Sequence, residues 1–319
     1  MDKPQTLRIL ALAGGGYLGL FTAMVLATLE ERAGEPLARR FDLIAGTSVG
    51  GILAMGLAFE VPMQRMVELF LQKGREVFSP RGLPSGPVSR MLDLSRSVLG
   101  PKYSGEALRA ALAEVLGEHT LDEALHDVVV PAVNVTRSLT KVFKTPHGPA
   151  SKGDEAVRAV DVAMATSAAP SYFPAVQIGD ALYADGGMFA VAPDQVALHE
   201  AEHFLGVRAD RVRMLSIGTA TFGYQPAGGV EGDDGAVGWL TDGRLLLTLL
   251  SVQQQHVQAM MEDRLGEGYL RIDAPWPAKA GLGIDVATRE ASQTLAGLAR
   301  QAMETVDVTV LDAFVGSAK

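Results

Sequence analysis

The sequence contains no cysteine, and this absence excludes disulfides, thiolate metal sites and a cysteine nucleophile. An excess of positive charge is also missing, because 28 lysines and arginines stand against 37 aspartates and glutamates, for a formal net charge of −9. Proteins bind nucleic acids through clustered Lys and Arg side chains, so we expect no nucleic-acid polymer as a partner. The acidic balance also argues against broad electrostatic attachment to anionic lipid, although it leaves a local apolar docking surface open.

Charge is also absent from residues 9–29, a run as long as a membrane span or a signal peptide. Three consecutive glycines at 14–16 fall in the middle of this run and would break a spanning helix. We therefore expect a strand over 7–13, a glycine turn, and a helix over 18–32.

The organisation along the chain predicts one α/β domain over residues 1–319, since 48% of the residues are apolar and can build a large core. Alternating strand-like and helical runs in the N-terminal half are typical of a mainly parallel sheet with helices on both faces. Further strands are expected over 41–46, 128–135, 141–144 and 212–217. Further helices are expected over 50–58, 63–72, 105–116 and 161–165.

Two segments rich in glycine, proline and polar residues interrupt this alternation, at 79–104 and 222–243. We interpret 79–104 as a lid-like excursion. Its apolar residues would either contact a membrane or pack the excursion itself, and they are Leu83, Val88, Met91 and Leu92. A C-terminal helical extension follows over 244–319, with helices expected over 244–264 and 286–307 and an edge strand over 269–272.

A serine between two glycines is the strongest chemical signal, since residues 46–50 read Gly-Thr-Ser-Val-Gly between an apolar strand-like run and an apolar helical run. In a strand, turn and helix, a G-x-S-x-G serine is presented as a nucleophile. The helix that starts behind Ser48 offers free backbone N–H groups to an oxyanion. The alternative is an ordinary glycine–serine loop.

A glycine-rich turn, Gly-Gly-Gly-Tyr-Leu-Gly at 14–19, follows the first expected strand and allows two interpretations. As G-x-G-x-x-G it matches a dinucleotide-binding fingerprint, for which Asp42 lies at a suitable distance along the chain. Asp42 begins an apolar run rather than ending one, which disfavours that interpretation. The other interpretation is an oxyanion hole that faces Ser48 from the neighbouring strand.

A general base is suggested by Asp185, which ends a short apolar stretch and precedes Gly186 and Gly187. If Asp185 lies near Ser48, it can take the hydroxyl proton once its surroundings raise its pKa. The alternative is a simple turn aspartate. Upstream, the small residues of 165–170 suit a helix that packs closely against the serine turn.

A third motif, H-E-x-x-H, spans residues 199–203 and would suit a zinc hydrolase with Glu200 as base. The extended pattern fails, because Ala209 stands where a third ligand is required, so we expect no metal site. The alternative is a solvated amphipathic helix over 194–204. A Ser-His-Asp triad with His199, His203 or His256 is also conceivable, but none of these histidines borders a glycine loop, which favours a dyad without histidine.

Together these segments resemble the patatin-like phospholipases. The family pattern is a glycine-rich turn, G-x-S-x-G, a small-residue segment that ends in proline, and D-G-G, which here lie in family order at 14–19, 46–50, 165–170 and 185–187. Residues 216–219 also resemble a later strand-end motif of the family. The resemblance implies a three-layer α/β/α sandwich and acyl-ester hydrolysis without a required cofactor.

The resemblance also assigns residues. It implies a catalytic dyad of Ser48 and Asp185. It implies an oxyanion hole built by Gly14, Gly15, Gly16 and Val49. The residues that would support these motifs are Gly19, Gly46, Gly50, Gly186 and Gly187. Departures from the family pattern at Ala13, Leu18 and 191–193 leave the dyad intact but leave the recognition of the lipid head group open.

Among patatin-like proteins, the chain is most similar to the bacterial effectors of the antiphage signalling system CBASS. The similarity lies in the amino-acid sequence of residues 13–23 and in the expected C-terminal helices. This similarity implies a cyclic dinucleotide activator, a membrane phospholipid substrate and a homo-oligomer on activation. It also implies a cytoplasmic protein that lies peripheral to the inner membrane when active. The alternatives are a constitutive lipase or esterase, a non-catalytic Rossmann-like nucleotide-binding protein and, third, a zinc peptidase.

Overall fold

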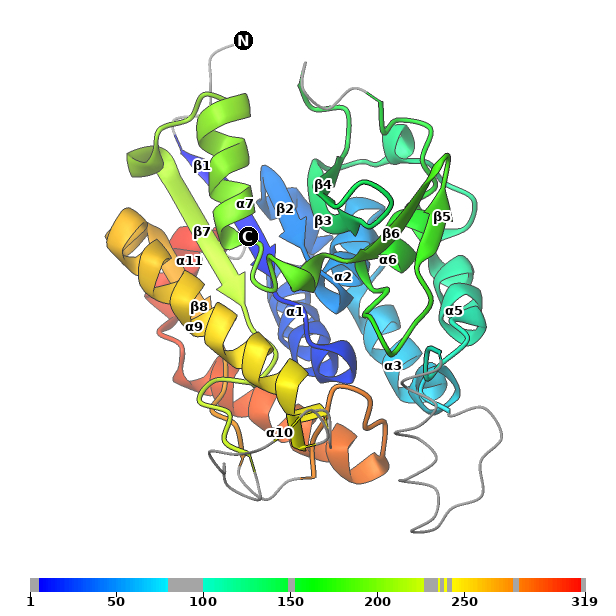
Figure 1. The fold of residues 1–319 in the computed structure, drawn as a ribbon. Coiled ribbons are helices and arrows are strands. Elements are labelled where there is room, and N and C mark those ends of the chain that lie inside the picture. Colours follow the sequence, from blue (N-terminus) through cyan, green and yellow to red (C-terminus); the bar gives the residue numbers. More distant parts are fainter. Residues whose placement is uncertain are drawn as a thin grey trace.

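A sheet of eight strands forms the middle layer of the computed structural model, with helices on both of its faces (Figure 1). The structure describes residues 6–79, 100–148, 153–226, 235, 238–239, 243–277 and 281–316. The strands are β1 (Leu7–Leu12), β2 (Leu43–Gly46), β3 (Val128–Asn134), β4 (Leu139–Lys144), β5 (Val176–Ile178), β6 (Ala181–Asp185), β7 (Val212–Ile217) and β8 (Tyr269–Ile272). Their order is β5-β6-β3-β2-β1-β7-β8, and β4 pairs with β3.

The centre of the sheet is parallel, as the sequence predicts. β3, β2, β1, β7 and β8 are joined by parallel pairs, whereas β4, β5 and β6 are joined by antiparallel pairs at one side. β1 is apolar without a break from Ile9 to Leu12, as a strand buried on both faces of a sheet requires, and its one charged residue, Arg8, is exposed. Ile9 and Ala11 pack into the core on one face of the sheet, and Leu10 and Leu12 pack into the core on the other.

The helices form the two outer layers. One face of the sheet is covered by α1 (Gly19–Ala33), α2 (Val49–Ala58), α3 (Met63–Val77), α5 (Glu106–Leu116), α6 (Ala159–Thr166), α10 (Arg289–Thr305) and α11 (Val308–Val315). The other face is covered by α7 (Asp194–His199), by a π-helical turn (Glu200–Phe204) and by the second half of α9 (Arg244–Leu265). Short 3-10 helices lie at Gly16–Leu18, Leu37–Arg40, Leu121–Glu123, Gly186–Met188, Ala209–Arg211 and Gly266–Gly268. The expected three-layer architecture is therefore confirmed.

Most predicted elements occur close to their expected positions, and the run 9–29 folds as strand, glycine turn and helix. Across the described ranges, no helix combines the length and the apolarity that crossing a membrane requires. The helix predicted over 286–307 is shorter, and a separate helix, α11, follows it. Residues 80–99 of the predicted excursion 79–104, with Leu83, Val88, Met91 and Leu92, lie outside the described residues.

The predicted C-terminal extension is built into the fold. β8 adds a parallel strand beside β7, and α10 packs along α1. The loop between β8 and α10 returns to the glycine-rich turn, where Ile284 accepts a hydrogen bond from the N–H of Tyr17 (2.7 Å). Residues almost 270 positions apart in the chain therefore share one site.

β2 and β6 run toward each other along the same edge of β3. β4 pairs with β3 from Val129 to Asn134 and so occupies one edge. β2 pairs in parallel with the start of β3, and β6 pairs antiparallel with its end. Because a strand has only two edges, β2 and β6 share the second edge of β3. The carboxyl ends of these strands, at Gly46 and Asp185, therefore meet beside the middle of β3.

Candidate active site

Ser48 lies in a sharp turn between β2 and α2. Its backbone has φ 55° and ψ −125°, a left-handed conformation that is strained for a residue with a side chain. The two flanking glycines allow the turn to close. A Cβ atom on Gly46 would overlap the carbonyl oxygen of Gly50, and one on Gly50 would overlap that of Leu12. The residue types of the motif are thus explained by close backbone packing, which holds the serine at the start of a helix.

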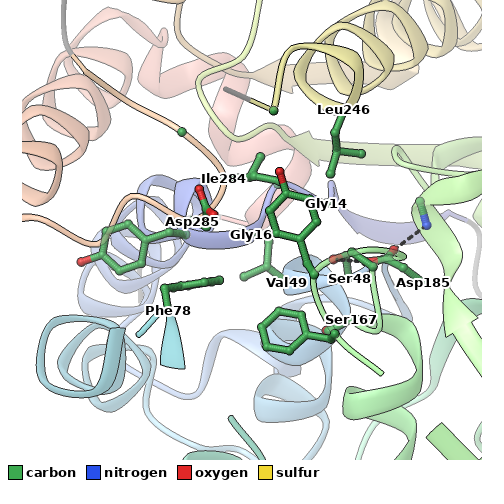
Figure 2. A pocket seen from close by; sticks show the side chains of 18 of the residues that line it. Gly14, Gly16, Ser48, Val49, Phe78, Ser167, Asp185, Leu246, Ile284 and Asp285 are labelled. Carbon is green, nitrogen blue, oxygen red and sulfur yellow. Dashed lines mark hydrogen bonds between the residues drawn. The ribbon is translucent and has the colours of Figure 1, made fainter. Parts of the chain in front are cut away.

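Asp185 is the hydrogen-bond partner of Ser48. The Ser48 hydroxyl donates to Asp185 Oδ2 at 2.7 Å, and the backbone N–H of Gly187 donates to Asp185 Oδ1 at 2.7 Å (Figure 2). Both carboxylate oxygens are therefore held, one by the hydroxyl it would deprotonate and the other by the D-G-G turn. The sequence places these residues 137 positions apart, and the meeting of β2 and β6 brings them together.

Burial controls the proton affinity of this carboxyl group. Asp185 is 6% exposed, and removal from water raises its pKa from 3.8 to about 6, against the opposing effect of the hydrogen bonds from Gly187 and Ser48. A carboxylate with this pKa is ionised at neutral pH yet far more basic than an exposed aspartate. These are the properties required of a general base for a serine hydroxyl.

Thr166, at the end of α6, holds the backbone of the nucleophile. The N–H of Ser48 donates to Thr166 Oγ1 at 2.9 Å, and that hydroxyl donates to the carbonyl oxygen of Pro131 at 2.6 Å. The N–H of Ser48 is thus already used. Sequence reasoning marked the small-residue segment 165–170 as packing against the serine turn, but it did not assign Thr166 a role, because only the fold shows which hydroxyl reaches that N–H.

The glycine-rich turn lies beside Ser48 from the neighbouring strand, as Figure 2 shows for Gly14 and Gly16. The N–H of Gly14 is occupied, because it donates to the carbonyl oxygen of Val191 at 2.8 Å. Within the described ranges, no acceptor takes the N–H of Gly15, Gly16 or Val49. Gly16 has φ +58°, and a Cβ there would overlap the carbonyl oxygen of Ile284, so this position requires glycine. Within the described residues, the N–H groups of Gly15, Gly16 and Val49 therefore have no acceptor, and these residues line the same cavity as Ser48.

The remaining motif glycines lie where backbone or side chains approach closely. A Cβ on Gly19 would overlap the side chain of Val49, and one on Gly186 would overlap the carbonyl oxygen of Pro131. Gly187 contributes its N–H to Asp185. These contacts join the glycine turn, the serine turn and the D-G-G turn into one packed unit.

A cavity of about 1160 Å³ opens over the Ser48–Asp185 pair. Its wall is mainly apolar and comes from several helices, with Ile52 from α2, Leu69 and Phe70 from α3, Leu112 from α5, and Leu246 and Leu249 from α9. Away from the serine, Lys102 forms an ion pair with Asp285 (2.7 Å), and both residues line the cavity. The size and the apolar wall suit a long hydrocarbon chain.

The H-E-x-x-H residues are committed to other contacts. Glu200 is buried and accepts hydrogen bonds from Lys144 and His147 (3.1 Å to the latter), which come from β4 and the loop after it. The rings of His199 and His203 stack on each other, with centroids 5.1 Å apart. The described ranges contain no group of three residues placed to bind a metal ion, and His199, His203 and His256 are absent from the described cavity wall.

The dinucleotide interpretation of the glycine turn is wrong in its geometry. Asp42 precedes β2, and its carboxylate accepts a hydrogen bond from the N–H of Arg8 at 2.7 Å. Because β1 and β2 are parallel, Asp42 lies at the opposite end of the strands from the turn at 14–19. The fingerprint requires an acidic group beside the ribose near that turn.

Comparisons with known proteins agree with this geometry. A family model described as patatin-like phospholipase matches residues 10–198. The cGAMP-activated phospholipase of Pseudomonas aeruginosa is 42% identical over 274 residues, which cover 86% of this chain and 80% of that protein. The protein with the same description from Vibrio cholerae is 33% identical, over 92% of this chain and 89% of its own. The one from Escherichia coli is 31% identical, over 94% and 89%.

The match includes each motif around the cavity. The family model spans the glycine turn, the serine turn and the D-G-G turn, and the residues of these turns meet at one cavity. The family model covers more than half of the chain, and the relatives match over most of their length. The protein belongs to the patatin-like phospholipase family.

Proposed function

We propose that this protein hydrolyses acyl esters of membrane phospholipids through Ser48 and Asp185, and that a cyclic dinucleotide switches the activity on. The observation that carries the proposal is the 2.7 Å hydrogen bond from Ser48 Oγ to Asp185 Oδ2 beside a large apolar cavity. A strained serine at a helix N-terminus, paired with a buried carboxylate, is equipped for nucleophilic attack on a carbonyl carbon.

In the first step, Ser48 Oγ attacks the ester carbonyl carbon while its proton moves to Asp185 Oδ2. The carbonyl oxygen becomes an oxyanion, which the free N–H groups of Gly15, Gly16 and Val49 stabilise. Gly14 keeps its N–H on Val191 and supports the turn rather than the oxyanion. When the carbon–oxygen bond to the alcohol breaks, the leaving lysolipid takes the proton from Asp185, and an acyl-enzyme remains.

In the second step, water replaces the lysolipid. Asp185 accepts a proton from the water as its oxygen attacks the acyl carbon, and the same N–H groups stabilise the second oxyanion. The bond to Ser48 Oγ then breaks and the proton returns to that oxygen. The products are a free fatty acid and the enzyme in its starting state, so no cofactor is needed.

The cavity and the exposed side chains beside it support a phospholipid substrate and a membrane location. The apolar wall can hold an acyl chain, and the exposed side chains of Met188 and Leu249 lie at the same cavity. Exposed apolar groups beside a lipid-sized cavity suit contact with a bilayer surface. We therefore propose that the active protein works as a cytoplasmic enzyme, peripheral to the inner membrane.

The proposed activator comes from the relatives. Three proteins described as cGAMP-activated phospholipases match this chain at 31–42% identity over most of its length. We propose that this chain likewise responds to a cyclic dinucleotide, assembles into a homo-oligomer when active, and serves antiphage defence through CBASS. A constitutive lipase is the competing function.

One experiment separates these functions. Fatty acid release from vesicles of phosphatidylethanolamine and phosphatidylglycerol is measured by mass spectrometry for the wild type and Ser48→Ala. Each protein is assayed alone and with cGAMP, cyclic di-GMP or cyclic di-AMP. Ser48-dependent release that requires one nucleotide supports the whole proposal. Ser48-dependent release without nucleotide supports the lipase and refutes the switch, and release that survives in Ser48→Ala refutes the dyad.

A further inference from the structure

A series of buried polar side chains is hydrogen-bonded to the glycine-rich turn. It consists of Thr219, which follows β7, Gln254 on α9 and Arg271 on β8. Thr219 has no exposed surface, Gln254 is 4% exposed and the Arg271 side chain is 6% exposed. Buried polar groups are costly unless they are paired. The hydrogen-bond partners of these three side chains therefore indicate what the side chains do.

The hydrogen bonds run in one direction, toward the glycine turn. Arg271 Nη2 donates to Gln254 Oε1 at 2.5 Å, and Gln254 Nε2 donates to Thr219 Oγ1 at 3.4 Å. Thr219 Oγ1 then donates to the carbonyl oxygen of Gly14 at 3.3 Å. The guanidinium is anchored at its other contacts by Asp273 (2.7 Å) and by Ser216 (2.8 Å).

The chemistry of the two ends dictates this direction. A guanidinium can only donate, so Gln254 must turn its carbonyl oxygen toward Arg271 and its amide nitrogen toward Thr219. A backbone carbonyl can only accept, so the Thr219 hydroxyl is the donor in its 3.3 Å contact with Gly14, and it is then the acceptor in its 3.4 Å contact with the Thr221 hydroxyl. Each donation polarises the next group along such a chain and strengthens its hydrogen bond.

The chain ends on the peptide group that carries a proposed oxyanion donor. The carbonyl of Gly14 and the N–H of Gly15 belong to the same planar, trans peptide unit, so fixing the carbonyl also fixes the direction of that N–H. At the other side of Gly14, its own N–H is held by Val191. Thr219 also packs directly against Gly15, where an added Cβ would overlap its side chain.

We infer that Thr219, Gln254 and Arg271 are positioning residues that aim and polarise the Gly15 N–H toward the oxyanion. The inference rests on the proposed function, because it concerns the same acyl-transfer site. It gives a role to the strand-end segment 216–219 and to α9, neither of which contributes a reacting group. Within the described residues, Ser48 and Asp185 form no hydrogen bond with these three side chains.

The test compares two hydroxyl deletions that differ only in what the hydroxyl touches. Thr219→Val removes the donor to Gly14, and Thr219→Ser keeps it. Thr221→Val is the matched control, because the Thr221 hydroxyl also accepts from Gln254 (3.0 Å) and lies 3.4 Å from the Thr219 hydroxyl, but it has no hydrogen bond to the glycine turn. Steady-state hydrolysis of p-nitrophenyl butyrate is measured from pH 5 to pH 8 with cGAMP present, together with thermal unfolding of each variant.

Loss of a whole oxyanion donor reduces kcat by about 100- to 1000-fold, and a misdirected donor should cost less. We expect Thr219→Val to lower kcat by about tenfold at unchanged KM, with the midpoint of the pH profile unmoved. Thr219→Ser and Thr221→Val should stay within about twofold of the wild type. A trifluoromethyl ketone inhibitor, which places an anionic oxygen in the hole, should bind Thr219→Val weaker by the same factor as kcat falls.

Three results would overturn the inference. These are unchanged kcat in folded Thr219→Val, an equal loss in Thr221→Val, and a loss that appears in KM instead of kcat. Ser48→Ala, assayed alongside, separates a failure of the proposed function from a failure of the positioning role. Retained hydrolysis in Ser48→Ala refutes the proposed function and the positioning role with it, whereas Ser48-dependent hydrolysis with a fully active Thr219→Val refutes the positioning role alone.

Discussion

Replacing Asp185 by asparagine should abolish activity and at the same time stabilise the fold at neutral pH. Ionising the Asp185 carboxyl is unfavourable in the folded chain, since burial raises its pKa from 3.8 to about 6. That difference in pKa lowers the free energy of unfolding by about 3 kcal/mol once the group is ionised in both the folded and the unfolded chain. Asparagine has nearly the same shape, can still accept from the Gly187 N–H, and never ionises.

The sign and the pH window follow from proton linkage. Between pH 3.8 and about 6 the folded chain binds more protons at Asp185 than the unfolded chain, so this group makes wild-type stability fall as the pH rises. About 1.4 kcal/mol of that loss occurs between pH 5 and pH 8. The stability advantage of Asp185→Asn over the wild type should therefore grow by about 1.4 kcal/mol across this interval.

Urea unfolding of both proteins at pH 5, 6, 7 and 8 measures how the difference in free energy of unfolding between Asp185→Asn and the wild type changes with pH. Any effect of the substitution that does not depend on pH cancels in this comparison. Asp180→Asn, at an exposed carboxyl that pairs with Arg137, is the matched control and should show little change over the same range. A stability difference that is flat with pH, or that shrinks as the pH rises, would refute the claim that burial of Asp185 tunes the general base.

Three further predictions concern the same site. With a soluble ester, kcat/KM should fall about tenfold from pH 7 to pH 5, with a midpoint near the general base's pKa of about 6; a profile without that midpoint would contradict the assignment. Thr166→Val leaves the Ser48 N–H without its partner and should lower the free energy of unfolding by about 1–3 kcal/mol, whereas Thr166→Ser should recover most of it. In Gly50→Ala the added methyl group would overlap the Leu12 carbonyl oxygen, so the free energy of unfolding should fall by at least about 2 kcal/mol. Gly297→Ala lies within α10 and has no close neighbour, so the free energy of unfolding should rise by about 0.5–1 kcal/mol. Equal effects of the two substitutions in urea unfolding would contradict the packing described.

The sequence predicts the chemical groups of the site better than the way they meet. Ser48 and Asp185 can be found from local motifs, because each needs a strand end and neighbouring glycines, and both features are visible in a short stretch of chain. The head-on meeting of β2 and β6 along β3 is set by strand pairing. Pairing depends on contacts between distant residues, so no local pattern reveals it.

Support from distant residues is the part that sequence reasoning missed. Thr166 reaches the Ser48 N–H, and Ile284 packs on Gly16, but neither residue stands in a motif with a recognisable chemical pattern. The opposite error also occurs, since a pattern can match without its chemistry. Glu200 sits in H-E-x-x-H, but Lys144 and His147 from another part of the fold already pair with its carboxylate.

The most direct test of the Ser48–Asp185 mechanism is to trap the acyl-enzyme. The protein, with cGAMP present, is mixed with p-nitrophenyl butyrate, quenched in acid within one turnover, digested and analysed by mass spectrometry. The mechanism predicts a butyryl group on Ser48 in the wild type, and formation of this adduct should be slower by orders of magnitude in Asp185→Asn. A butyryl group on another residue, or an undiminished rate of Ser48 acylation in Asp185→Asn, would contradict it.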